Sequence, residues 1–173
     1  STLIIVYNYK LFNNPAPQAS GTNALPGVSV IIAAKNEAHN IPVLIDALSH
    51  QTTSSELYEI LIVNDHSSDN TRELVQSLSA HYPWLVSLSL PEGGASGKRA
   101  ALSFGIARAK FDFIGITDAD CIPGTAWIES LQRSFVKDNS FVFGPAISDM
   151  SGNYTSRIGS FEKFKGSLLI YAA

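Results

Sequence analysis

Apolar runs and helix-like stretches alternate along most of this chain. Nearly continuous apolar runs at 28–34, 58–63, 85–90, 111–117 and 141–144 are typical of strands buried on both faces of a sheet. The segments 40–49, 71–80, 98–109 and 126–136 lie between these runs and are predicted helices. This regular alternation predicts an α/β fold, a three-layer sandwich in which helices cover both faces of a mostly parallel sheet.

The same pattern divides the chain into three parts. Residues 1–27 have the proline, glycine and small polar residues of a linker, and their apolar start resembles a juxtamembrane segment, although a short surface strand or a disordered tail would also fit. Residues 28–150 form the predicted domain. Residues 151–173 form a predicted amphipathic helical segment of that domain, which would pack on the domain itself or on a membrane surface.

Composition narrows the class of protein. The chain has 173 residues, of which 45% are hydrophobic and 16% charged, as expected for one globular domain. A net charge of −3 gives no indication of a broad nucleic-acid-binding face. The single cysteine, Cys121, excludes an internal disulfide framework and a multi-cysteine zinc site, and is typical of a reducing compartment.

Polar residues follow three of the predicted strands. Lys35-Asn36-Glu37 follows the first, Asn64-Asp65-His66 the second, and Asp118-Ala119-Asp120 the fourth. Ligands bind beyond the carboxyl ends of the strands in open parallel sheets. Carboxylates gathered there repel one another unless a cation or a ligand compensates, so a binding site is expected at this edge.

Asp118 and Asp120 are the candidate metal ligands. Two carboxylates two residues apart can share a divalent ion, and hard oxygen ligands suit Mg²⁺ or Mn²⁺, which also bind nucleotide phosphates. A capping turn is the structural alternative, since Asp is common in turns. The position directly after a buried strand favours the metal site.

A glycine-rich stretch, Gly93–Gly97, leads into Lys98 and Arg99 at the start of a predicted helix. It is not a Walker A motif, because Glu92 and Arg99 stand where that motif needs Gly and Ser or Thr. A diphosphate contact through backbone N–H groups and Lys98 would fit, as would an exposed flexible loop. His66 could line the same site or lie on a surface turn.

Four segments taken in order resemble the inverting family-two glycosyltransferases, which have a Rossmann-like GT-A fold. They are 28–37, 62–71, 97–102 and 117–120, and the resemblance covers about residues 28–144. It implies that Asp65 accepts a hydrogen bond from the base, usually uracil, and that Glu37 and the backbone near Ala33 flank the base and ribose. The implied nucleotide-sugar site comprises Ala33, Ala34, Asn36, Glu37, Asp65, Lys98, Asp118 and Ala119, with Asp120 and Asp118 as ligands of Mn²⁺ or Mg²⁺.

The resemblance also implies a reaction, transfer of a sugar from a nucleotide-diphosphate donor, usually a UDP-sugar, to a glycan or lipid acceptor with inversion. The protein would be a hexosyltransferase of polysaccharide biosynthesis at the cytoplasmic face of a membrane, possessing no nucleic-acid partner and reaching the membrane through flanking segments. Its acidic catalytic base is expected beyond Ala173, because no Glu-Asp or Asp-Asp motif of the family stands before Ala173, and Asp149 and Glu162 are poor candidates by context. Residues 1–173 alone are therefore expected to be inactive.

One further departure and two alternatives remain. His66 stands where the family often has glycine, at a turn that favours a positive φ. A non-catalytic nucleotide-sugar-binding module would share the same binding residues. A nucleotidyltransferase would place a glycine-rich phosphate loop directly after the first strand, where this chain has Ala33–Glu37.

Overall fold

A single six-stranded sheet organises the computed structural model, which describes residues 4–8, 25–136 and 141–144. The strands are β1 (Ile4–Asn8), β2 (Val28–Ala34), β3 (Tyr58–Asn64), β4 (Leu85–Ser89), β5 (Phe113–Ile116) and β6 (Phe141–Gly144), in the order β4-β3-β2-β5-β1-β6. The helices are α1 (Ile41–Ser49), α2 (Thr71–Ser79), α3 (Lys98–Ile106) and α4 (Trp127–Val136), with a 3₁₀ turn, η2, at Ser55–Leu57. The pairs β3–β4, β2–β3 and β2–β5 are parallel.

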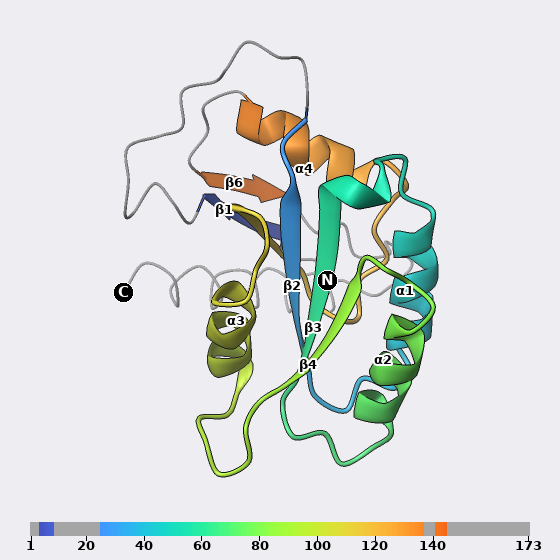
Figure 1. Ribbon diagram of the computed structural model, residues 1–173, viewed down its shortest axis with the longest axis vertical. Coiled ribbons are helices and arrows are strands. Elements are labelled where there is room, and N and C mark those ends of the chain that lie inside the picture. Colours follow the sequence, from blue (N-terminus) through green and yellow to red (C-terminus); the bar gives the residue numbers. More distant parts are fainter. Residues whose placement is uncertain (1–3, 9–24, 137–140, 145–173) are drawn as a thin grey trace, which may run out of the picture.

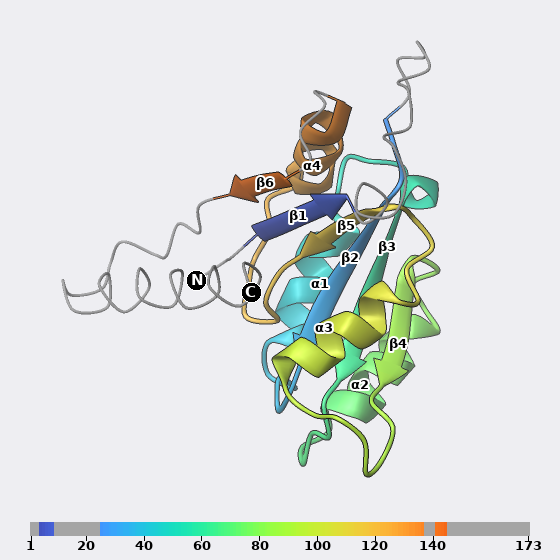
Figure 2. The ribbon, with the colours of Figure 1, turned by 90° about the vertical axis from the view of Figure 1, so that its left-hand side faces the viewer.

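Strand β1 lies in the segment for which the sequence left a juxtamembrane segment, a short surface strand and a disordered tail open. It pairs antiparallel with both β5 and β6, with Ile5 opposite Ile116 on one side and opposite Phe143 on the other. Five of the residues assigned above to a linker or juxtamembrane segment therefore lie within the sheet, between two strands more than 100 positions away (Figure 2). The remaining boundaries of the three predicted parts stay predictions, and residues 151–173 lie outside the described residues.

Side chains of the parallel strands alternate between two cores. Residues such as Val30, Ile32 and Ile60 face one hydrophobic cluster, which α1, α2 and α4 cover through Leu44, Val75, Ile128 and their neighbours. The intervening residues, such as Ile31, Leu61 and Val63, face a second cluster under α3. Figure 1 shows the resulting three layers, with α1 and α2 on one side of the sheet and α3 on the other. The predicted three-layer α/β sandwich with a mostly parallel sheet is confirmed.

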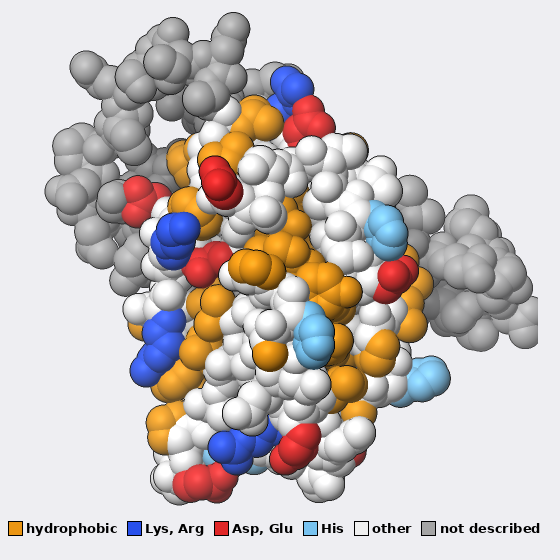
Figure 3. All heavy atoms as spheres, turned by 45° about the vertical axis from the view of Figure 1, so that its right-hand side comes forward, with side chains coloured by type: hydrophobic (Ala, Val, Ile, Leu, Met, Phe, Trp, Pro, Cys, Tyr) orange, Lys and Arg blue, Asp and Glu red, His pale blue; other side chains and the backbone are white. Residues whose placement is uncertain are grey.

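The face shown in Figure 3 has hydrophobic side chains across its middle and scattered acidic, basic and histidine side chains around them. Among the residues that the structure describes, no helix combines the length and the apolar character needed to cross a bilayer.

The close approach of α3 to the sheet depends on Gly105. A Cβ added to Gly105 would lie 2.5 Å from Cγ2 of Ile31 and 3.1 Å from Cγ2 of Val63, both in the buried core. Gly105→Ala should gain about 1 kcal/mol of helix propensity but lose roughly 1–3 kcal/mol to overpacking. We therefore expect a lower free energy of unfolding in urea, by up to about 2 kcal/mol.

The control for this variant is Ser103→Ala, on the exposed side of the same helix. This change raises helix propensity without adding an atom to the core, so it should leave stability equal or slightly higher. A Gly105→Ala protein as stable as the Ser103→Ala protein would show that α3 can move away from β2 at no cost.

Candidate functional site

A cavity of about 410 Å³ opens at the carboxyl ends of β2, β3 and β5, at the lower end of the sheet in Figure 1. Parallel strands bring together here the residues that directly follow each of them. The cavity is lined by Ala33, Ala34, Lys35, Glu37, Asp65, Gly97, Lys98, Asp118, Ala119 and Asp120. Four of the ten are acidic and two are lysines, so the cavity offers both hydrogen-bond acceptors and cations to a ligand.

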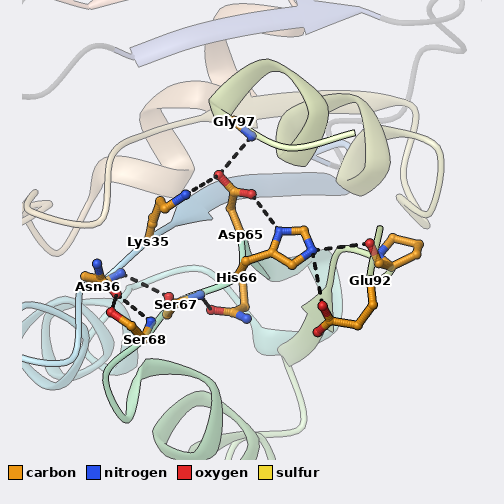
Figure 4. Close-up of polar contacts among 10 residues, drawn as sticks. Lys35, Asn36, Asp65, His66, Ser67, Ser68, Glu92 and Gly97 are labelled. Atoms are coloured by element: carbon orange, nitrogen blue, oxygen red, sulfur yellow. Dashed lines mark hydrogen bonds and ion pairs between the residues drawn. The ribbon is translucent and has the colours of Figure 1, made fainter. Parts of the chain in front are cut away.

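Asp65 is the most buried charged group of the cavity, with 3% of its surface exposed. Its Oδ2 accepts a hydrogen bond from the Gly97 N–H at 2.9 Å and lies 3.7 Å from Nζ of Lys35 (Figure 4). Burial raises the pKa of this carboxyl, but the hydrogen bonds from His66 and Gly97 and the charge of Lys35 outweigh burial and lower it below the usual 3.8. Asp65 is therefore ionised near neutral pH and can accept hydrogen bonds only.

His66 lies behind Asp65, against the loop that follows β4. Its Nδ1 is 3.1 Å from Oδ1 of Asp65 and its Nε2 is 3.2 Å from the carbonyl oxygen of Pro91 (Figure 4). The backbone of His66 has φ 51°, in the left-handed region that favours glycine. The turn thus keeps the conformation expected of the family's glycine although a histidine occupies it.

The loops after β2 and β3 are joined by hydrogen bonds. The side-chain oxygen of Asn36 accepts from the Ser68 N–H at 2.8 Å, and the Asn36 N–H donates to the hydroxyl of Ser67 at 3.0 Å. Asp69 accepts from the N–H of Ala38 at 3.2 Å. These bonds fix the spacing of the two loops that carry Glu37 and Asp65. The positions of these two cavity residues relative to each other are therefore set by the loops.

Lys98 and Asp118 form an ion pair across the cavity. Nζ of Lys98, at the first position of α3, lies 2.5 Å from Oδ1 of Asp118, which follows β5. Both side chains are partly exposed, so the pair contributes little to stability. The pair places the ammonium group of Lys98 beside the carboxylates, where a phosphate group could replace Asp118 as the partner of the lysine.

The two carboxylates Asp118 and Asp120 fit a hard divalent cation only in part. Asp120 is exposed and lines the same cavity as Asp118. Within residues 4–8, 25–136 and 141–144, no group of three or more His, Cys, Asp or Glu side chains could hold a metal. Mg²⁺ is usually bound by one or two carboxylates together with substrate phosphates and water, so this donor set fits a metal that arrives with a nucleotide.

Every predicted nucleotide-sugar or metal residue lines this cavity except Asn36, whose side chain points to Ser68 instead. Lys35 and Gly97 also line it, although the sequence placed them only in the first strand-end segment and in the glycine-rich stretch, without assigning them to the nucleotide-sugar site. For His66 the sequence left a surface turn as the structural alternative. The contacts of Gly97 and His66 with Asp65 depend on a loop path that the sequence does not specify.

Comparisons with known proteins agree with this geometry. The family described as "Glycosyl transferase family 2" matches residues 29–170. Glycosyltransferase AglE of Haloferax volcanii is 37% identical over 108 residues, which are 62% of this chain and 35% of AglE. The chain therefore spans about a third of the length of this relative.

Solved structures show the same fold. The mannosyltransferase PcManGT from Pyrobaculum calidifontis, in complex with GDP-Man and Mn²⁺, superposes with a TM-score of 0.55 at 27% identity, covering 65% of this chain and 32% of its own. Staphylococcus aureus TarS 1–349 in complex with UDP gives a TM-score of 0.57 at 21% identity, with the same coverage. The predicted GT-A fold is confirmed by these neighbours, and the chain belongs to glycosyltransferase family 2.

Proposed function

We propose that this protein binds a UDP-sugar in the cavity between β2, β3 and β5 and transfers the sugar, a hexose, to a glycan or lipid acceptor with inversion. The observation that carries the proposal is that Asp65, Lys98 and the Asp118–Asp120 pair all line one cavity. A base-binding acceptor, a phosphate-binding cation and two metal-binding carboxylates are the groups that a nucleotide-diphosphate sugar requires. The complexes of TarS with UDP and of PcManGT with GDP-Man support a nucleotide donor.

The base would lie against Ala33 and Ala34 with its polar edge toward Asp65. Uracil carries an N–H between two carbonyl groups, and an ionised carboxylate is an acceptor suited to that N–H. The N–H of Gly97 already bonds Oδ2 of Asp65, which leaves further acceptor sites on the carboxylate for the base. Glu37 and Lys35 lie on the same rim and are the proposed contacts for the ribose.

The diphosphate would lie at the start of α3. The first N–H groups of a helix have no partner within the helix, and together with the helix dipole they favour an anion. Lys98 adds a cation that its pairing with Asp118 already holds over the cavity. These groups stabilise the negative charge that develops on the leaving diphosphate as its bond to the anomeric carbon breaks.

Asp118 and Asp120 would hold Mn²⁺ or Mg²⁺ together with the diphosphate oxygens. When bound, the cation supplies additional positive charge to the leaving group. PcManGT, crystallised with GDP-Man and Mn²⁺, supports this assignment. The base that deprotonates the acceptor hydroxyl is proposed to come from outside residues 4–8, 25–136 and 141–144, since the four acidic side chains of the cavity already have donor-binding roles.

Nucleotide selectivity tests the proposal directly. Calorimetry with UDP, GDP, CDP and ADP in the presence of Mn²⁺ should show UDP binding most tightly. The ring N–H of uracil between its two carbonyl groups can donate to Asp65, whereas the corresponding ring nitrogen of cytosine carries no hydrogen. A preference for GDP would still agree with a glycosyltransferase, but the donor would then be a GDP-sugar instead of a UDP-sugar. Equal binding of all four nucleotides would remove the base-recognition role of Asp65.

Transfer itself is tested with the full-length protein and with residues 1–173. Release of UDP that depends on a glycan or lipid acceptor, followed by NMR of the anomeric proton of the product, reports both activity and stereochemistry. We expect acceptor-dependent turnover with inversion from the full-length protein only. The rival hypothesis, a non-catalytic binding module, requires nucleotide binding without turnover by either protein. The protein is also proposed to lie at the cytoplasmic face of a membrane. Fractionation of cells that produce it into membranes and cytosol tests its association with a membrane.

A further inference from the structure

His66 occupies a backbone position that costs energy for any residue with a side chain. Its φ of 51° lies in the left-handed region, which Gly adopts freely and other residues adopt at a cost. Its ring is largely covered, with 26% of the side chain exposed, and both ring nitrogens are within 3.2 Å of a polar atom. The hydrogen bonds of the ring are the compensation that the structure shows.

Both partners of the ring are acceptors. Nδ1 faces Oδ1 of Asp65, which is ionised, and Nε2 faces the backbone carbonyl oxygen of Pro91 (Figure 4). A neutral imidazole has one N–H and can donate to only one of these oxygens, whereas an imidazolium donates from both nitrogens. The observed arrangement is therefore complete only when His66 carries two protons.

Through these two bonds, His66 connects the base-binding carboxylate to the loop at 91–97. Pro91 at the beginning of this loop accepts from His66, and Gly97 at its end donates to Oδ2 of Asp65. Lys98, which pairs with Asp118, follows directly. The loop is thus held at both ends around Asp65, and loss of either ring proton would break the connection that His66 makes between Asp65 and Pro91.

We propose that His66 is a positioning residue that, as an imidazolium, holds Asp65 and the 91–97 loop in the arrangement that binds the base, so that donor affinity declines when His66 loses a proton. The part of this inference that concerns donor affinity rests on the proposed function. The protonation of the His66 ring and the order of the 91–97 loop are properties of the ligand-free protein. His66 would not touch the reacting atoms.

The charged groups around the ring agree with this assignment. Asp65 is in contact, the exposed carboxylate of Glu92 lies 4.0 Å from Nε2, and Lys35 approaches the far oxygen of Asp65 at 3.7 Å. The hydrogen bond to Asp65, followed by that to Pro91, raises the pKa of His66 above its usual 6.5. The contribution of His66 is therefore fully present below pH 6.5 and is lost as the pH rises through the higher folded-state pKa.

Asp65 sets the acid limit of the same contact. Its pKa is lowered below 3.8, so its contribution is present above pH 3.8 and is lost as the pH falls through the folded-state value. Between these limits both partners of the bond are charged. The contact between His66 and Asp65 is therefore stronger near pH 5.5 than under mildly alkaline conditions.

The test compares the wild-type protein with His66→Asn. Asparagine tolerates a positive φ and supplies a donor that does not titrate. The probe is UDP-GlcNAc with Mg²⁺, because its diphosphate has no terminal phosphate that ionises in this range. We expect the wild-type Kd to rise roughly three- to tenfold between pH 5.5 and 8.5, the effect of one net hydrogen bond, and the His66→Asn Kd to stay constant. The same pH dependence in both proteins would overturn the proposal.

Measurements without ligand separate this inference from the proposed function. NMR of the ring nitrogens should show two protons on His66 at pH 6, and amide exchange in the 91–97 loop should speed up as His66 titrates. A neutral His66 at pH 6 would overturn the proposal even if the Asn variant does not fold. If His66 titrates as expected but UDP-GlcNAc binds at no pH, the proposed function is contradicted. Only the role of His66 in holding the 91–97 loop would then remain.

Discussion

Replacing Asp65 by alanine should weaken UDP binding by about 1–3 kcal/mol, roughly 5- to 150-fold, the range for leaving a buried polar partner unsatisfied. The carboxylate is almost fully buried and is the acceptor proposed for the uracil N–H. Its loss also removes the acceptor of the Gly97 N–H and the partner of His66. Calorimetry with UDP and Mg²⁺ measures the effect, and circular dichroism checks that the variant is folded.

Asp65→Asn separates base recognition from packing. The amide has the shape of the carboxylate and can keep one acceptor oxygen for the Gly97 N–H, but its nitrogen is a donor. It can no longer accept from uracil with that atom, whereas it could donate to the ring nitrogen of cytosine, which carries no hydrogen. We expect the preference for UDP over CDP to shrink or reverse. A variant that keeps the wild-type preference would place the base elsewhere in the cavity.

Replacing Asp120 by asparagine should remove the dependence of nucleotide binding on a divalent cation. Altering a group that merely hydrogen-bonds to a metal ligand costs about 10- to 100-fold in metal affinity, and loss of a direct ligand should cost at least as much. The fold should be unaffected, because Asp120 is exposed. UDP affinity is measured with Mn²⁺ and with chelator for both proteins. The wild-type protein should lose affinity in chelator, whereas the variant should already be at that lower level.

Asp112→Asn is the matched control for charge. It makes the same substitution just before the opposite end of β5, away from the cavity, and should retain the cation effect. If chelator leaves wild-type UDP binding unchanged, the metal assignment of Asp118 and Asp120 is wrong. If both variants lose the cation effect equally, long-range charge rather than coordination is responsible.

The central part of the fold could be predicted because its signals are local. Continuous apolar runs such as Val28–Ala34 can be buried only between two layers, and parallel strands then bring Glu37, Asp65 and Asp118 to one edge without further information. β1 could not be predicted in the same way. Its five residues form an apolar run too short to distinguish a strand from a membrane boundary, and its partners are far away in the sequence.

The details of the site illustrate the same limit. The type of residue at position 36 suggested a ligand contact, but the side chain bonds to the neighbouring loop, as Asn often does beside turns. His66 was a departure from the family pattern, and only the path of the loop that begins at Pro91 gives its ring a second acceptor besides Asp65. The sequence therefore predicted which strand ends meet in one cavity, whereas the contacts between loops required coordinates.

The insertion of β1 between β5 and β6 has a consequence for biosynthesis. Residues 4–8 leave the ribosome before their partners at 113–116 exist. At about 5–20 residues per second, the intervening stretch of about 100 residues takes roughly 5–20 s to make. Meanwhile β2, β3 and β4 can already assemble with their helices, whereas the backbone of β1 has no strand to pair with. Of the six strands that the structure describes, the one made first is thus among the last to be placed, and β6 can join the sheet only after it.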